Sequence, residues 1–175
     1  MQTNPTIKLR AMEPNDIDAI YRWENDPTLW QYSAAHQPFA RSVLQQFIEQ
    51  QADADIYTTR QLRLMADTDG DRAVGCVDLF DFDPYHRRAA IGLIVDSHYR
   101  HSGYGAAIVR QLEAFAVQHL LLHQLHCTIA ADNQHCINLF THSGYTPAGT
   151  LRQWVWNGQQ WGDAVILQKV LDNTL

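Results

Sequence analysis

Apolar residues recur along the chain in two spacings that separate strands from helices. Short runs or alternations predict β-strands, whereas apolar residues three and four apart predict helices. The predicted strands cover residues 7–12, 61–66, 73–82, 89–95, 125–129, 150–156 and 164–170. The predicted helices run from Pro14 to the break at Asn25–Pro27, from Arg41 to about Gln51, from Gly103 to about Leu122, and over residues 133–142. Strands and helices mixed in this order predict an α+β domain with a mixed sheet.

Turn residues between the predicted strands indicate how neighbouring strands pair. Asp67–Asp71 and Asp83–His86 each give two strands a short, polar connection. Asn157-Gly158 is a strong hairpin signal between the last two strands. These turns predict mostly antiparallel neighbours. No repeat or linker divides the 175 residues, so we expect one domain over residues 1–175.

Charge and cysteine content narrow the class of partner. The formal charge of −6 argues against a nucleic-acid-binding protein, which normally has a basic face. It suits a small cationic partner or a basic peptide, although solubility alone also explains it. The three cysteines show no C-x-x-C spacing and indicate a reducing, cytoplasmic environment. The chain opens without a basic apolar leader, and no apolar run approaches the roughly 18 residues that cross a bilayer, so no membrane partner is expected.

The segment from Ile91 to Ala106 carries the clearest chemical signal. An apolar run ends at Val95, polar residues follow, and Gly103-Tyr104-Gly105 opens an amphipathic helix. Glycines let an anion approach the main-chain N–H groups, and the positive end of the helix points at the same place. The pattern predicts a binding loop for a pyrophosphate-bearing cofactor.

Arg100-His101-Ser102-Gly103-Tyr104-Gly105 resembles the acetyl-CoA signature of the Gcn5-related N-acetyltransferase (GNAT) superfamily, and the element order is similar over nearly the full length. The resemblance implies a mostly antiparallel central sheet of about seven strands, splayed between the fourth and fifth strands and flanked by about four helices. It implies acetyl-CoA as co-substrate, with the pyrophosphate on the loop and the pantetheine arm beside the fourth strand. The cofactor-binding residues expected are Ile94, Val95, Arg100, His101, Ser102, Gly103, Tyr104, Gly105, Ala106, Asn133 and Phe140.

Residues 133–145 resemble a second GNAT block, in which an Asn reaches the pantetheine arm and a Tyr protonates the departing thiolate. Asn133 fits the first role and also suits the N-cap of the predicted helix. Phe140 stands where many relatives carry the Tyr, and a phenyl ring has no proton to donate. Cys136, Tyr145 or water is then left as the acid. Branches that act on protein N-termini often lack that Tyr too.

A third resemblance concerns the acceptor amine. Residues 9–16 with Trp23–Pro27 and Trp30 are similar to a GNAT branch that contains spermidine and ribosomal-protein N-terminal acetyltransferases. In that branch the first two helices border the acceptor pocket, which places Glu24, Asp26 and Trp30 near the amine. Alternation puts residue 78 on one face of its strand and residue 81 on the other, without showing which face meets the pocket. The candidate bases are Glu24, Asp78, Asp81 and Asp83. Solvated carboxylates at a strand end also explain the three aspartates, and ordinary polarity at a helix end also explains Glu24.

These observations predict an acetyl-CoA-dependent N-acetyltransferase for a primary amine, first of all a small cationic, polyamine-like amine. A protein N-terminal α-amine is the alternative, and a non-catalytic acyl-CoA-binding module is a rival of another class, motivated by Phe140. His119 and His123 share a face of the predicted helix, but no Glu follows His119 as the H-E-x-x-H zinc pattern requires, so no metal is expected. The sequence allows a homodimer or a higher homo-oligomer and does not decide the oligomeric state.

Overall fold

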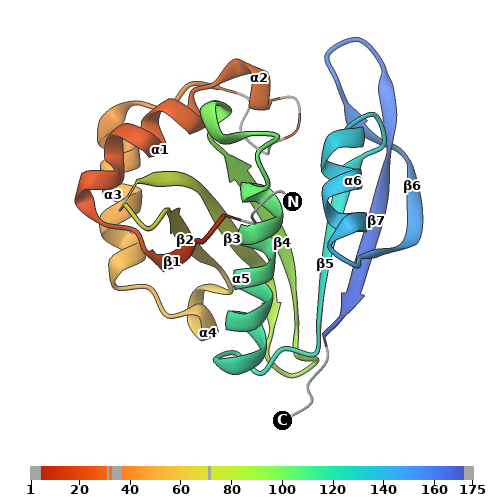
Figure 1. Ribbon diagram of the computed structural model, residues 1–175. Coiled ribbons are helices and arrows are strands. Elements are labelled where there is room, and N and C mark those ends of the chain that lie inside the picture. Colours follow the sequence, from red (N-terminus) through yellow and green to blue (C-terminus); the bar gives the residue numbers. More distant parts are fainter. Residues whose placement is uncertain (1–4, 31, 33–36, 71, 172–175) are drawn as a thin grey trace.

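The computed structural model describes residues 5–30, 32, 37–70 and 72–171, and its strands form one sheet (Figure 1). The strands lie in the order β1-β2-β3-β4-β5-β7-β6, and only β4 and β5 are parallel neighbours. This arrangement confirms the predicted mixed, mostly antiparallel sheet of the GNAT type. The strands are β1 (Lys8–Ala11), β2 (Leu62–Asp67), β3 (Ala73–Asp83), β4 (Arg88–Val95), β5 (Gln124–Ala130), β6 (Thr146–Trp156) and β7 (Trp161–Val170).

Four of the helices correspond to the predicted ones, and two single-turn helices do not. Each unpredicted helix follows an aspartate whose side chain accepts a hydrogen bond from the main chain two residues on, at Asp26 and Asp55. Such N-caps form a turn without a long apolar stripe, so periodicity misses them. The α-helices are α1 (Ile17–Glu24), α2 (Pro27–Trp30), α3 (Arg41–Ala52), α4 (Ile56–Thr59), α5 (Tyr104–Gln118) and α6 (Gln134–His142), with 3-10 turns η1 (Pro14–Asp16) and η2 (Ser97–Tyr99).

Helix α5 is shorter than predicted. It ends at Gln118, and the chain then turns through Leu121, which has a φ of 54°. The prediction of a helix to Leu122 was wrong because Leu122 continues the apolar pattern while packing into the core beyond the helix. His119 and His123 therefore do not share a helix face, contrary to the sequence-based prediction.

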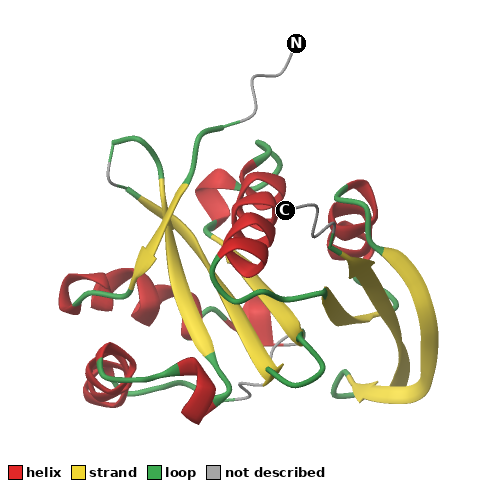
Figure 2. Ribbon diagram, turned by 90° about the horizontal axis from the view of Figure 1, so that it is seen from below, coloured by secondary structure: helices red, strands yellow, loops and turns green. Residues whose placement is uncertain are grey.

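Helices cover the two faces of the sheet unequally (Figure 2). Side chains of α5 and α6 pack on one face in a large core that includes Leu64, Val77 and Leu125. Helices α1 and α3 pack on the other face in a smaller core with Met65 and Cys76. Because neighbouring strand residues such as Leu64 and Met65 fall in different cores, strand alternation is preserved through the middle of the sheet.

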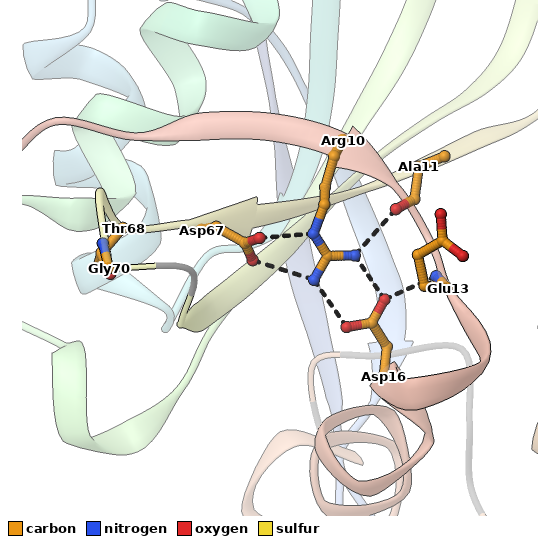
Figure 3. Close-up of polar contacts among 7 residues, drawn as sticks. All are labelled: Arg10, Ala11, Glu13, Asp16, Asp67, Thr68 and Gly70. Carbon is orange, nitrogen blue, oxygen red and sulfur yellow. Dashed lines mark hydrogen bonds and ion pairs between the residues drawn. The ribbon is translucent and has the colours of Figure 1, made fainter.

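A buried ion cluster holds the start of the chain on the sheet (Figure 3). The Arg10 guanidinium on β1 donates to Asp67 on β2 at 2.5 Å and to Asp16 on η1 at 2.7 and 2.8 Å. Both carboxylates are buried. Asp16 also accepts the Glu13 N–H at 2.8 Å, which completes the turn that leads into α1. The cluster thereby fixes the entry of α1, the helix that borders the candidate site.

Candidate active site

Strands β4 and β5 touch at one end and then diverge (Figure 1). Their pairing covers only residues 88–90 of β4 and 124–126 of β5, whereas β4 stays paired with β3 as far as Val95. The Asp96 N–H donates to Val74 on β3, so alternation turns the main-chain groups of Ile94 toward β3 and those of Leu93 and Val95 toward the gap. The gap is therefore lined by free strand edge, and Val95, not Ile94, presents its main chain there.

The loop that follows β4 has a row of unused donors. None of the N–H groups from His101 to Ala106 has an acceptor within the described ranges. His101 and Gly103 have φ values of 60° and 85°, and such left-handed residues turn successive N–H groups to one side. The positive end of the 15-residue α5 adds to the same region. The loop therefore has the geometry of an anion-binding site.

Arg100 and Gly105 fix this loop against the structure around it. The Arg100 Nε donates to the Val95 carbonyl at 2.9 Å, so the side chain holds the loop on the end of β4. A Cβ on Gly105 would lie 3.1 Å from Leu139 of α6 and 3.7 Å from Val95. The absent side chain lets the first turn of α5 pack closely on α6 and β4.

Helix α6 brings the second predicted block to the loop. The rings of His101 and His135 lie 5.2 Å apart, and Asn133 precedes this first turn of α6. The Asn133 Oδ1 accepts the Cys136 N–H at 3.2 Å, so Asn133 is the N-cap. Its amide N–H₂ has no acceptor within the described residues and is left for a ligand. The two sequence blocks, more than 25 residues apart, thus meet at one place.

A family model matches the part of the chain that contains the diverging strands, the loop and α6. The family model described as acetyltransferase (GNAT) domain matches residues 6–146, which include the diverging strands, the loop and α6. The chain belongs to the GNAT acetyltransferase family. This GNAT chain is 24% identical over 162 residues to the spermidine N(1)-acetyltransferase of Escherichia coli K12, across 91% of the chain and 83% of that protein. For the Vibrio cholerae spermidine N(1)-acetyltransferase the identity is 20% over 150 residues, across 85% and 83%.

Solved structures confirm the GNAT fold. The spermidine N-acetyltransferase from Vibrio cholerae in complex with CoA and spermine matches with a TM-score of 0.85 and 17% identity, over 96% of this chain and 97% of that one. A dodecameric structure of the spermidine N-acetyltransferase from Vibrio cholerae matches with a TM-score of 0.79 and 17% identity, over 97% and 96%.

Phe140 and Tyr145 are buried in this GNAT chain, and Cys136 is partly buried. Phe140 is 2% exposed and packs edge-to-face on Tyr145, with ring centres 5.0 Å apart. The Tyr145 hydroxyl is also buried. Burial raises the pKa of the Cys136 thiol to about 11, so that thiol stays protonated at neutral pH. Phe140 therefore packs in the core of the described structure, and its contact with a cofactor stays a prediction.

Two of the candidate bases are paired with one arginine. Arg63 on β2 donates to Glu24 of α1 at 2.5 Å and to Asp78 of β3 at 2.6 and 2.9 Å. This contact settles which face Asp78 occupies, because Glu24 reaches the sheet from the α1 side. A Cβ on Gly92 of β4 would lie 3.7 Å from Asp78, so the group adjoins the strand that borders the gap. Sequence reasoning missed Arg63, since its partners are 39 and 15 residues away.

The other predicted acceptor and base residues have separate contacts. Asp26 caps α2 and accepts from the Thr28 hydroxyl at 2.7 Å, which with nearby Arg100 lowers the pKa of Asp26. The Trp30 indole donates to the Glu24 carbonyl at 2.9 Å and so holds α2 against the end of α1. Asp83 accepts the His86 N–H, which lowers its pKa, and Asp81 is exposed in an irregular part of β3 with a φ of 49°.

Asp96 is a second residue that the sequence did not mark. It is 2% exposed and directly follows β4, where it accepts hydrogen bonds from Arg22, Trp23 and His98. Its position between an apolar strand and the polar loop is typical of a turn residue. Only the folded structure brings α1 against it.

Proposed function

We propose that this GNAT chain transfers the acetyl group of acetyl-CoA to a primary amine of a small polycation such as spermidine. The proposal depends above all on the unused N–H groups from His101 to Ala106 beside the free edge of β4. A diphosphate accepts such main-chain donors at a helix N-terminus. The Leu93 main chain and the Val95 N–H pair with the pantetheine arm as an added strand would, whereas the Val95 carbonyl already accepts from Arg100. Asn133 contributes its amide.

The relatives and the charge on the acceptor side support the polyamine. Two relatives, at 24% and 20% identity, are spermidine N(1)-acetyltransferases. In this chain Glu24 and Asp78 share one guanidinium, so the group around Arg63 keeps one net negative charge beside β4. A low-dielectric site with one excess negative charge favours a cationic amine. Positioning the two substrates together supplies a large part of the rate.

Assembly and location extend the proposal. A solved relative from Vibrio cholerae is dodecameric, and we infer a homo-oligomer for this chain, to be checked by light scattering on the purified protein. None of the helices in the described ranges has the length and apolarity that a membrane span requires. Action in the cytoplasm is part of the proposal.

The test is a thiol-release assay with acetyl-CoA and three acceptors: spermidine, an aminoglycoside and a basic peptide with a free N-terminus. We expect release with spermidine and an N-acetylated product by mass spectrometry. Turnover of the peptide alone would instead support N-terminal acetylation. Tight acetyl-CoA binding without turnover of any amine would contradict the enzyme proposal and favour the non-catalytic module.

A further inference from the structure

His126 occupies the point where β4 and β5 separate. It pairs with Ala90 as the last residue of the parallel ladder, and beyond it the two strands diverge. A ligand arm that enters the gap along β4 is directed toward this point. His126 was not among the residues that the sequence marked, because one histidine among nine carries no positional signal.

Strand alternation places the His126 ring on the open face of the sheet. Its neighbours Leu125 and Cys127 are buried in the core under α5 and α6, so His126 faces the other way. There it lines a hollow of about 280 Å³ together with Arg88, Gln124, Ile166 and Gln168. The ring is half-buried, and no hydrogen bond within the described residues involves either ring nitrogen. Both nitrogens are therefore left for a ligand or water.

The surroundings keep this ring neutral at physiological pH. Burial lowers the pKa of His126, Asp81 on β3 opposes that shift, and Arg88 on β4 adds to it. The remaining residues that line the hollow, from β5 and β7, carry no titratable group. A neutral imidazole accepts a proton, and the carboxylate of Asp81 stabilises the imidazolium once it forms.

Building on the proposed function, we propose that His126 is the catalytic base that takes a proton from the acceptor ammonium. A primary ammonium has a pKa of about 10, so a base must remove a proton before attack at neutral pH. Glu24 and Asp78 are already paired with Arg63, and Asp81 is exposed on β3. Among these described groups, His126 is the unpaired base at the point where β4 and β5 separate.

The reaction balances with this single base. His126 takes one proton from R–NH₃⁺ and later releases it to solvent. The neutral amine forms the N–C bond to the acetyl carbon, and the C–S bond breaks. The second proton of the amine nitrogen ends on the thiolate, which gives N-acetylamine and free CoA thiol. Asp81 does not touch the amine and acts on the ring only through its charge.

The experiment compares pH–rate profiles of wild type, His126→Gln and the control His119→Gln with spermidine. His119 is exposed and lies outside the site. We expect His126→Gln to lower kcat/KM at pH 7 by about 100-fold, within the range for a general base. The deficit should shrink toward pH 10, where the amine loses its proton unaided. Acetyl-CoA affinity and melting temperature should stay near those of wild type.

A second variant separates proton transfer from structure. In His126→Ala, added imidazole should restore part of the activity, because it can occupy the vacated space in the hollow. An unchanged rate in His126→Gln, or a loss that is equal at every pH and resists imidazole, would overturn the assignment while the proposed function stands. A wild-type chain that acetylates no amine would contradict the proposed function itself and the assignment with it.

Discussion

The Trp23 indole donates to the Asp96 carboxylate over 2.8 Å, which joins helix α1 to the last turn before the anion-binding loop. Arg22 donates to the same oxygen at 2.5 Å. The other oxygen accepts from the N–H and the ring of His98 at 3.0 and 2.8 Å. One buried carboxylate thus connects the helix that carries Glu24 with the loop proposed to hold the pyrophosphate.

Asp96→Asn should therefore weaken both stability and acetyl-CoA binding. The asparagine amide has the size of the carboxylate, but its N–H₂ group faces the side chains of Arg22, Trp23 and His98, which are themselves donors. The substitution also removes the negative charge that these donors face. We expect a loss of about 2–3 kcal/mol in the free energy of unfolding, as for hydrogen bonds to a charged group, measured by urea denaturation. Asp83→Asn is the control, because the contacts of Asp83 stay within the turn between β3 and β4. Equal midpoints for the two variants would contradict the proposed link.

A negative charge on the loop should block the cofactor. Ser102→Glu adds a carboxylate at an exposed position beside the unused N–H groups, and Ser102→Gln adds a similar bulk without charge. We expect at least a tenfold weaker acetyl-CoA affinity for the Glu variant alone, by titration calorimetry, with unchanged melting temperature. Equal affinities in the two variants would remove the loop from the site.

Gly103→Glu should lose acetyl-CoA binding as well, but at a cost in stability. The φ of Gly103 is 85°, and an added Cβ would lie 3.2 Å from Pro5. A left-handed residue with a side chain costs about 1–2 kcal/mol. We expect a lower melting temperature than in Ser102→Glu and no cofactor binding. Unchanged acetyl-CoA affinity would contradict the site assignment.

Phe140→Tyr tests whether the enzyme lacks only a proton donor for the thiolate. Since the ring is buried against Tyr145, the new hydroxyl should lower stability by about 1–3 kcal/mol unless it finds a partner. We expect kcat with spermidine to be kept or raised. Tyr145→Phe removes a hydroxyl from the same aromatic pair and is the control. A large fall in kcat in Phe140→Tyr alone would show a pocket built around phenylalanine.

Acid should destabilise the fold through Asp16 and Asp96. Burial raises both carboxyl pKa values, but hydrogen bonds from Arg10 to Asp16, and from Trp23, His98 and Arg22 to Asp96, outweigh it and lower them. A lowered pKa contributes stability above the unfolded-state value of about 3.9, which is lost as pH falls through it toward the folded value. Urea midpoints at pH 7, 5, 4 and 3 should fall less steeply in Asp16→Asn than in wild type. The exposed variant Asp18→Asn should follow wild type.

The sequence predicted the strands well because each keeps a period of two or ends at a turn. It placed the start of β6 at residue 150 and not at Thr146, since Pro147 and Gly149 look like a loop. An edge strand tolerates such residues because one side of it needs no partner. The anion loop was visible because its residues are contiguous. The contacts of Arg63, Asp96 and His126 were not, because they join segments that only the sheet register brings together.

The narrow join between β4 and β5 has a mechanical consequence. Only three residue pairs join the β1–β4 part of the sheet to the β5–β7 part. Helices α5 and α6 support this short connection on one face of the sheet. A thioester arm lying along β4 would fill the gap between the two parts of the sheet and hold them apart. Binding of the acyl donor would then set the angle between the two parts of the sheet, and with it the position of the open face of β5–β7 relative to the amine.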